Sequence, residues 1–484
     1  MAKQKDFEQG ITPQSEDFSK WYVDTILKAQ LADYSCVRGC MNIRPYGYAL
    51  WENIRDQLDK RIKETGHENA YFPLFVPESF LKKEAEHVEG FAPEVPWVTH
   101  VGEEELTERL AIRPTSETVI CAAYSEWIQS YRDLPLLINQ WANVVRWEKR
   151  TRLFLRTSEF LWQEGHTCHR TEEEAREETM KMLEVYRECC ENEMAMPVTP
   201  GRKTESEKFA GAVETYSIEG MLADGNAIQA GTSHFLGQNF AKAFDIKFLD
   251  EDNTEKYVWQ TSWGVTTRLV GSVIMSHGDD SGLILPPRIA PIQVVVVPVY
   301  RESSKTQVLE EADKLTQEIK DAGIRVKIDA RENMRPGFKY NEWELKGVPF
   351  RVEIGPKDIE KGHVVAANRM NREKTFIKRP EVTAELTRML EAFQSDLLER
   401  AKKRETKATR TASSFDELAE IIEKERGYVR AGWDGSAETE AAVKERTKAT
   451  IRNIPLEGGE PEEGMVDLVS GKPAKHSVLF ARAY

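Results

Sequence analysis

Residues 141–170 read WANVVRWEKRTRLFLRTSEFLWQEGHTCHR, a segment in which aromatic rings alternate with charged side chains. Val144 and Val145 lead into Arg146, and this mixture of apolar and charged residues predicts a half-exposed strand. A strongly basic turn, Lys149–Arg152, leads to a second strand-like run that contains Phe154, Leu155, Phe160 and Trp162. The segment therefore predicts an arginine-rich β-hairpin.

The charges of this hairpin suit a ligand that carries phosphates, a flat ring and a small charged group. The planar fork of arginine binds phosphate oxygens through two hydrogen bonds and stays charged at any working pH. An edge hairpin with solvated charges would show the same pattern. Both interpretations stay open for this segment alone, and the remaining sequence has to decide between them.

The overall composition excludes several classes of protein. With 484 residues, of which 40% are hydrophobic and 31% charged, the chain has room for two to four globular domains. A net charge of −14 disfavours sequence-independent binding of nucleic acid. Apolar runs such as Val294–Val297 are too short to cross a bilayer, and the N-terminal MAKQKDFEQG lacks an apolar signal core. We therefore expect a cytoplasmic protein with no membrane association.

The six cysteines are expected to be reduced thiols in such a compartment. Cys36 and Cys40 have a loose metal-like spacing, but no second Cys or His pair accompanies them. The adjacent Cys189 and Cys190 are interpreted as packing residues of a helix. We predict neither structural disulfides nor a metal site.

Two helices are expected near the N-terminus, at 17–32 and after a break at Pro45–Gly47. The second helix has an apolar face that is either core or a subunit interface, formed by Trp51, Ile54, Leu58 and Ile62. The segment AYFPLFVPESFL that follows (70–81) is predicted to be a buried strand ended by prolines.

Three further segments carry candidate ligand-binding residues. Thr115 and Glu117 follow Pro114 at the start of a predicted helix, where they either cap the helix or receive a cationic amine. In the run 229–234, QAGTSH, glycine permits either close approach of a ligand or a β-bulge. Arg268 enters a mostly apolar helix, so it is either a buried ion-pair partner or faces an anionic ligand.

Secondary structure changes after Pro286–Pro291. A capping box at 171–174 starts a helix with an apolar face before this point. Beyond it, strands (292–299, 324–329, 350–354, 363–368) alternate with helices (304–322, 337–346, from 382), which predicts a compact α/β domain. The basic segment 401–410 is a linker or exposed helix, followed by a helix at 415–426 and a turn at 432–435. We expect three domains, at 1–287, 288–398 and 399–484.

Several segments match known motifs. Arg38-Gly39 through Pro45-Tyr46-Gly47, with the helix that follows, matches a first motif; VVRWE with FLRTSEFLWQEGHT matches a second; GVTTRLVG with HGDDSGLILPP matches a third. The segments RPTSE and QAGTSH are present letter for letter. On these residues the chain resembles the class II aminoacyl-tRNA synthetases, and specifically the prolyl-tRNA synthetases of the archaeal and eukaryotic type, along essentially its whole length.

This resemblance implies an α/β fold class: an α+β catalytic domain built on an antiparallel sheet, an α/β anticodon-binding domain and a small α+β C-terminal domain. It implies a homodimer that activates L-proline with ATP and Mg²⁺ to prolyl-adenylate, releases pyrophosphate, and transfers proline to the 3′ end of tRNA(Pro). The alternative is a catalytically inactive paralogue that binds tRNA or a regulatory partner. A synthetase for a different small amino acid is disfavoured by RPTSE and GTSH.

The resemblance also assigns roles to residues. Arg146 and Arg268 would neutralise the transferring phosphoryl group, as positioning and charge do in such reactions. The implied ATP-binding residues are Arg146, Glu148, Arg156, Phe160, Gln229, Thr232, Thr266 and Arg268. The implied proline-binding residues are Thr115, Glu117, Arg146, Trp162, Glu164, His166, Phe209 and His234. The basic turn Lys149–Arg152 is interpreted as the tip that faces the tRNA.

Four expectations concern the remaining parts. Glu353, Lys357 and Arg369 are candidate anticodon contacts, although each could equally be a solvated charge. Arg268 follows His166 by only 102 positions, which leaves no room for the editing insertion of bacterial-type relatives. Many relatives bind zinc in the C-terminal domain, but this chain has no cysteine after Cys190, so no structural zinc is expected. The terminal Tyr484 is hypothesised to reach toward the catalytic domain.

Overall fold

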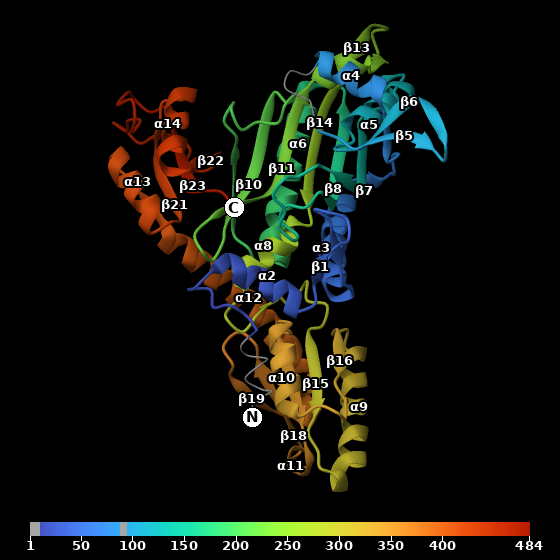
Figure 1. The fold of residues 1–484 in the computed structure, drawn as a ribbon, viewed down its shortest axis with the longest axis vertical. Coiled ribbons are helices and arrows are strands. Elements are labelled where there is room, and N and C mark those ends of the chain that lie inside the picture. The colour runs from blue at the N-terminus through green and yellow to red at the C-terminus, as the bar shows by residue number, and fades with distance from the viewer. Residues whose placement is uncertain (1–9, 88–93) are drawn as a thin grey trace.

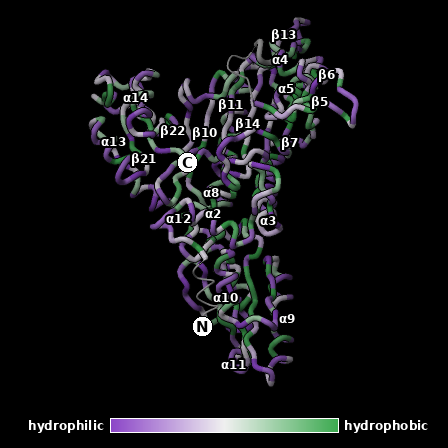
Figure 2. Tube along the Cα trace, viewed as in Figure 1, coloured by the Kyte–Doolittle hydropathy of each residue, from purple (hydrophilic) through white to green (hydrophobic). Residues whose placement is uncertain are grey.

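The computed structural model describes residues 10–87 and 94–484, and an eleven-stranded sheet runs through its upper part. The C-terminal region lies beside the central strands of this sheet, and a separate α/β domain lies below it (Figure 1). Hydrophobic and hydrophilic residues alternate throughout all three regions (Figure 2). No helix in the described residues is both long and apolar enough to span a membrane.

The central part of the large sheet is antiparallel, as expected for the class II catalytic fold. Its strands, in spatial order, are β9 (Val198–Arg202), β10 (Glu214–Met221), β11 (Ala227–Gly237), β14 (Trp259–Thr266), β8 (Glu159–His169) and β7 (Leu136–Val145), with the short parallel β3 (Glu68–Asn69) at the edge. Helix α6 (Glu172–Glu188) packs on one face of this sheet. Its predicted capping box between Thr171 and Glu174 is confirmed, and the predicted apolar face is buried.

The predicted hairpin is confirmed, but its second strand begins later than predicted, at Glu159. β7 and β8 pair from Leu136↔Cys168 to Val145↔Glu159. Phe154 and Leu155 lie in the connection and not in β8, and both are buried in the core. Phe154 has a positive φ of 61°, which lies outside the β region that non-glycine strand residues adopt. The connection thus turns inward, and its apolar residues anchor it against helix α8 (Arg268–His277).

The N-terminal region consists of α2 (Phe18–Lys28), the hairpin β1 (Ala32–Tyr34) and β2 (Met41–Ile43), and α3 (Pro45–Glu64). The predicted break at Pro45–Gly47 is wrong, because Pro45 is the first residue of α3. Proline is tolerated at this position since an N–H group there would have no partner within the helix. A Cβ on Gly47 would lie 2.2 Å from the carbonyl oxygen of Leu31, so only glycine permits this close approach. The apolar face of α3 is buried within the chain itself, which confirms the core interpretation.

A small three-stranded sheet lies beside β7. It contains β4 (Phe75–Pro77), β6 (Glu104–Ile112) and β5 (Trp97–Val101), with α4 (Glu78–His87) and α5 (Glu117–Trp127) beside it. The prediction of a buried strand over 70–81 is wrong, because β4 is only three residues long and Phe75 is 44% exposed. A 3₁₀ turn (Tyr131–Asp133) connects α5 to β7.

The segment between β8 and α8 builds the sheet and its surroundings. It holds α6, a π-helical turn (Cys189–Glu193), β9 to β11, α7 (Asn239–Phe244), the hairpin β12 (Lys247–Leu249) and β13 (Glu255–Tyr257), and β14. Cys189 and Cys190 are buried in this turn, as packing residues. All six cysteines lie in the described residues and are free thiols.

The α/β domain has the predicted alternation of elements. Its sheet order is β16 (Val326–Ile328), β15 (Val294–Pro298), β17 (Phe350–Ile354), β18 (His363–Asn368) and β19 (Lys374–Lys378); its helices are α9 (Lys305–Asp321), α10 (Pro336–Leu345), α11 (Pro356–Lys361) and α12 (Val382–Ala408), with short 3₁₀ turns at Glu302–Ser304 and Arg379–Glu381. Helix α12 extends through most of the basic segment 401–410, so that segment is not a linker.

The C-terminal region extends the large sheet. It comprises β20 (Thr409–Thr411), α13 (Phe415–Lys424), β21 (Tyr428–Trp433), α14 (Ala437–Thr447), β22 (Ala449–Pro455) and β23 (His476–Arg482). β22 pairs with β9 through Ile454↔Arg202 and Pro455↔Gly201. The expected turn at 432–435 starts later, because Gly432 and Trp433 still belong to β21.

Candidate functional site

A cavity of about 660 Å³ opens between the β7–β8 hairpin, β11, β14 and the start of α8. This volume falls within the range of small-molecule sites. Every residue predicted to bind ATP or proline lines it: Thr115, Glu117, Arg146, Glu148, Arg156, Phe160, Trp162, Glu164, His166, Phe209, Gln229, Thr232, His234, Thr266 and Arg268. These residues come from segments far apart in the sequence, so the fold has brought them together.

The two residues proposed at the start of α5 are joined to each other. The Thr115 hydroxyl donates a hydrogen bond to the Glu117 carboxylate, and both side chains are buried. Ser116, not Thr115, occupies the N-cap position of the helix, and the Ser116 side chain makes no capping hydrogen bond. The helix-cap interpretation of Thr115 is therefore wrong. Its hydroxyl instead orients a carboxylate at the edge of the cavity.

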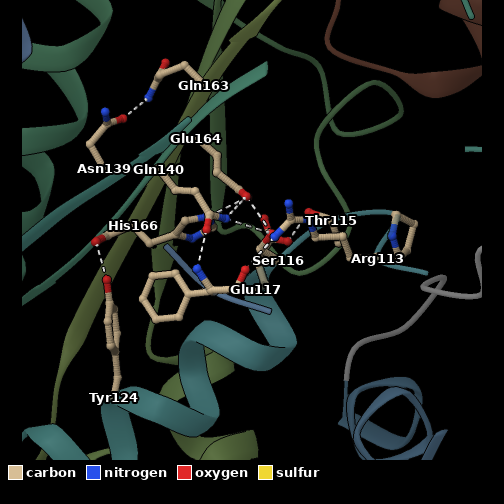
Figure 3. A network of polar contacts seen from close by, with 12 residues as sticks. Arg113, Thr115, Ser116, Glu117, Tyr124, Asn139, Gln140, Gln163, Glu164 and His166 are labelled. Carbon is tan, nitrogen blue, oxygen red and sulfur yellow. Dashed lines mark hydrogen bonds and ion pairs between the residues drawn. The ribbon is translucent and has the colours of Figure 1, made fainter. Parts of the chain in front are cut away.

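Glu164 is the centre of a buried polar network (Figure 3). Its Oε1 accepts hydrogen bonds from Ser116 Oγ at 2.5 Å and from Gln140 Nε2 at 2.8 Å. Its Oε2 lies 3.0 Å from His166 Nε2, and the backbone oxygen of His166 accepts from the Tyr124 hydroxyl at 2.9 Å. Because each oxygen of Glu164 has a partner, the network holds the carboxylate rigidly below the cavity.

The surrounding protein shifts the pKa values of the two histidines of the site in opposite directions. Burial opposes the protonation of His166, but its hydrogen bond to Glu164 and the charges of Glu117 and Glu164 raise its pKa above the usual value. Burial, with a smaller effect of His166, lowers the pKa of His234 to about 3. His234 is therefore neutral at pH 7, and its Nδ1 lies 3.0 Å from the Thr215 hydroxyl. The cavity thus has one neutral imidazole, and one whose protonated form is favoured by the neighbouring carboxylates.

Two arginines point their guanidinium groups at the cavity. Arg146 donates from Nε to the carbonyl of Pro114 at 2.9 Å, and its guanidinium lies 5.4 Å from the ring of Trp162. The Arg268 guanidinium makes long hydrogen bonds, of 3.4 Å, to the carbonyls of Leu155 and Gln229.

Neither guanidinium forms an ion pair with a described carboxylate, and desolvation by the surrounding protein lowers the pKa of both. Each nevertheless remains charged, because arginine does not lose its proton in proteins. The interpretation of Arg268 as a buried ion-pair partner is therefore wrong. Two positive groups with unused hydrogen-bond donors suit an anion such as a phosphate.

Aromatic and polar residues complete the wall. Arg156 pairs with Glu148 at 3.2 Å and is largely exposed at the mouth. Phe160 and Trp162 meet edge to face at 6.3 Å between ring centroids. Phe209 lies on the 203–213 loop between β9 and β10, and its ring centroid is 4.8 Å from that of His234.

Residues of the site that the sequence did not predict include Arg113, Gln140 and Thr215. Arg113 is completely buried and donates to the carbonyls of Phe72 and Asn143, both at 2.8 Å. It is the first letter of RPTSE, so the motif did contain a signal. Nothing in the sequence marks Gln140 or Thr215: the partners of Gln140 are 24 or more positions away, and Thr215 joins Phe209 to His234 only in the folded chain.

The anticodon candidates differ from one another. Arg369 is buried, and its guanidinium forms a two-pronged ion pair with Asp279 at 2.6 and 2.9 Å, which joins the α/β domain to the central one. The anticodon assignment of Arg369 is therefore corrected to an interdomain contact. Glu353 pairs with Arg351 and Lys374, whereas Lys357 is exposed on α11.

The residues of the basic turn also differ in their exposure to solvent. Lys149 and Arg150 are exposed, but Arg152 is half-buried with its guanidinium 4.7 Å from the ring of Tyr484. The backbone N–H of Tyr484 donates to the carbonyl of Ala227 at 3.0 Å. The chain terminus therefore reaches the central domain, as hypothesised, and Arg152 is unavailable as part of an exposed tip.

Aspartates and hydroxyls occupy the C-terminal corner where zinc ligands were considered. Asp467 accepts from the backbone N–H groups of Val469 and Ser470, both at 2.8 Å, and Asp434 accepts from the Ser470 hydroxyl at 2.9 Å. Asn453 instead lies in β22 and donates to the carbonyl of Thr199. Within residues 10–87 and 94–484, no group of three or more His, Cys, Asp or Glu side chains is arranged to hold a metal ion.

Comparison with known families matches three consecutive parts of the chain. Residues 97–277 match the tRNA synthetase class II core domain (G, H, P, S and T), residues 293–389 an anticodon binding domain, and residues 415–484 the C-terminal domain of prolyl-tRNA synthetases.

Relatives are similar over their full length. A proline–tRNA ligase of Natranaerobius thermophilus is 59% identical over 482 residues, with 99% of both chains covered. That of Symbiobacterium thermophilum is 58% identical over 491 residues, with both chains covered completely. That of Chlorobium luteolum is 57% identical over 480 residues, with 98% of this chain and 99% of the relative covered.

Proposed function

The chain belongs to the class II prolyl-tRNA synthetases, and we propose that the 660 Å³ cavity is where it joins proline to ATP. The reaction has two steps: proline and ATP give prolyl-adenylate and pyrophosphate, and the prolyl group then passes to the 3′ end of tRNA(Pro). The observation that carries this assignment is the meeting of two unpaired arginines with a buried carboxylate network in one cavity.

In the first step a carboxylate oxygen of proline attacks the α-phosphorus of ATP, and the bond to pyrophosphate breaks. Arg146 and Arg268 approach this point from the hairpin and from α8, respectively, and neutralise the charge that develops on the phosphoryl oxygens. No protein nucleophile is required, because positioning and charge carry such transfers. Phe160 offers a face to the adenine ring, and Glu148, Arg156, Gln229, Thr232 and Thr266 supply polar contacts to ATP.

Magnesium would accompany the triphosphate. Mg²⁺ takes most of its ligands from phosphate and water and usually only one or two from protein carboxylates. A cavity with Glu148 at its phosphate end fits this requirement without a preformed cluster of acids. The ion would neutralise phosphate charge while Arg146 and Arg268 orient the oxygens.

Proline occupies the inner half of the cavity. Its cationic nitrogen faces Glu117, which the Thr115 hydroxyl orients, and its carboxylate faces Arg146. Its ring lies against Trp162, Phe209 and neutral His234, while Glu164 and His166 form the polar floor. Discrimination between proline and amino acids of similar size is limited, because a difference of one methylene changes the binding free energy by only ~1–3 kcal/mol.

We assign the other partners by domain, with boundaries at 1–287, 288–398 and 399–484. The exposed Lys149 and Arg150 contact the acceptor end of tRNA, and Glu353 and Lys357 contact the anticodon. A homodimer is supported by the exposed apolar residues Tyr34 and Val37, just before the first motif, and Tyr48, in the helix that belongs to it. We place the protein in the cytoplasm. We also propose that it binds no structural zinc, because Asp434 and Asp467 form hydrogen bonds within the C-terminal domain. Elemental analysis tests the zinc assignment, and light scattering tests the dimer.

Proline-dependent exchange between ATP and labelled pyrophosphate tests the activity. Exchange that requires proline, together with charging of tRNA(Pro), is the expected result. Binding of tRNA without any exchange would instead favour an inactive paralogue. Faster exchange with another small amino acid would favour a different specificity.

A further inference from the structure

The 203–213 loop carries Phe209 to the cavity, and the C-terminal domain holds this loop from outside. Thr204 Oγ1 donates to Glu440 Oε1 at 3.0 Å, and Ser206 Oγ donates to Glu440 Oε2 at 2.7 Å. Glu440 belongs to α14 and is 6% exposed. One buried carboxylate of the C-terminal domain thus spans two hydroxyls of the loop, which also lie 3.0 Å from each other.

The first residue of the loop has a second attachment to the same domain. Lys203 Nζ donates to the backbone carbonyl of Arg452 at 2.6 Å and to Glu219 at 2.8 Å. Arg452 reaches the other oxygen of Glu219 at 2.9 Å, and all three side chains are buried. The start of the loop is therefore fixed between the central sheet and β22, and Figure 1 shows the C-terminal domain beside β10, the strand that carries Glu219.

Phe209 links the anchored loop to the cavity. The backbone N–H of Phe209 donates to Thr215 Oγ1 at 3.0 Å, and the same hydroxyl lies 3.0 Å from His234 Nδ1. The Phe209 ring packs on the His234 ring. Because Phe209 follows Thr204 by only five positions, displacement of the anchored end would shift the ring that lines the cavity.

We propose that Glu440 is a positioning residue: the C-terminal domain uses its carboxylate to hold the 203–213 loop, and thereby sets the affinity of the cavity for proline. Glu440 touches neither proline nor ATP and acts only through Thr204 and Ser206. The inference rests on the proposed contact between proline and Phe209. It assigns the C-terminal domain a role in amino-acid binding that is separate from its contact through Tyr484.

Steady-state pyrophosphate exchange with the full-length chain tests the proposal. Glu440→Ala should raise KM for proline about tenfold, because two hydrogen bonds to a buried carboxylate are lost, and should change KM for ATP less than twofold. Glu440→Gln, which keeps the shape and one acceptor, should raise KM for proline only two- to threefold. Glu445→Gln, on the exposed side of the same helix, should match the wild type.

A double-mutant cycle separates positioning from general destabilisation. Thr204→Val combined with Ser206→Ala should raise KM for proline as much as Glu440→Ala, and all three changes together should have no larger effect. Equal increases in both KM values, unchanged KM for proline, or additive effects would each overturn the proposal.

Phe209→Ala distinguishes this inference from the proposed site. If Phe209→Ala leaves KM for proline unchanged, the proposed proline pocket fails. If it raises KM while Glu440→Ala does not, the pocket stands and the role of Glu440 is refuted.

Discussion

His166 Nε2 lies 3.0 Å from Glu164 Oε2, and both side chains are buried beneath the cavity. The partner of each charge is thus within the protein, and Ser116 and Gln140 satisfy the other oxygen of Glu164. Glu117, in contrast, is bound by the Thr115 hydroxyl and lines the cavity, where a ligand can reach it. Neutralising Glu117 should therefore weaken ligand binding, whereas neutralising Glu164 should destabilise the fold.

Glu117→Gln is expected to raise KM for proline by about 10- to 100-fold, because it removes the charge that faces the imino nitrogen and costs about 1.5–3 kcal/mol. Its free energy of unfolding should change by less than about 1 kcal/mol. Exchange kinetics and urea unfolding measure the two effects. Glu126→Gln, at an exposed position of the same helix, is the control. A loss of stability without a change in KM would contradict the assignment.

Glu164→Gln should instead destabilise the fold in a pH-dependent way. The pKa of His166 is higher in the folded protein than in the unfolded chain, where it is near 6.5. The His166–Glu164 pair therefore stabilises the fold fully below pH 6.5, and this stabilisation is lost as the pH rises through the folded pKa. The variant lacks this contribution. The difference in unfolding free energy between variant and wild type should therefore be larger at pH 6 than at pH 9, and urea titrations at both values measure it. A difference that grows with pH would be incompatible with a raised pKa of His166.

Arg268→Lys is expected to lower kcat for proline activation by about 10²- to 10³-fold, because it removes the planar fork that orients phosphate oxygens. Stability should be retained, since the hydrogen bonds of the Arg268 guanidinium to carbonyls in the protein are long. Arg388→Lys, on the exposed face of α12, serves as the matched control. Pyrophosphate exchange near wild-type rates would remove Arg268 from the proposed mechanism.

Reversing the charge of the hairpin tip with Lys149→Glu and Arg150→Glu should weaken tRNA charging by about tenfold or more and leave proline activation within twofold. Both side chains are exposed, so no packing is lost. Raising the salt concentration should narrow the difference, because screening weakens contacts with phosphates. Equal losses in the charging and exchange assays would argue against a tRNA-facing tip.

Glu405→Gln should stabilise the protein above pH 7. Burial raises the pKa of the α12 residue Glu405 to about 7, and its Oε2 has no hydrogen-bond partner. The unfolded chain releases this proton near pH 4.5, so stability falls as pH rises from 4.5 to 7 and stays reduced above it. The gain should be about 1–3 kcal/mol at pH 8 and small at pH 5. Thermal unfolding at the two values measures it, and a larger gain at pH 5 would be evidence against the buried carboxylate.

Regular elements and motif residues were predictable because their signals are local. The alternation of Arg146, Phe160, Trp162 and Glu164 indicates a hairpin, and the start of α6 follows from one capping box. The errors also had local causes. The predicted break at Pro45 is wrong because proline both interrupts regular structure and starts helices, as it does here. Phe154 and Leu155 were placed in a strand because apolar spacing does not distinguish a strand from an inward-turning connection.

The sequence by itself determined the family, the three-part organisation and the chemical types of the cavity residues, because these depend on residues close together in the chain. Tertiary structure decided which of them have partners. It joined Gln140 to Glu164, left Arg268 without an ion pair, and engaged Arg369 with Asp279. It also brought Glu440 to Thr204, 236 positions away. Contacts over such separations depend on how strands and domains pack, and packing leaves no mark in the local order of residues.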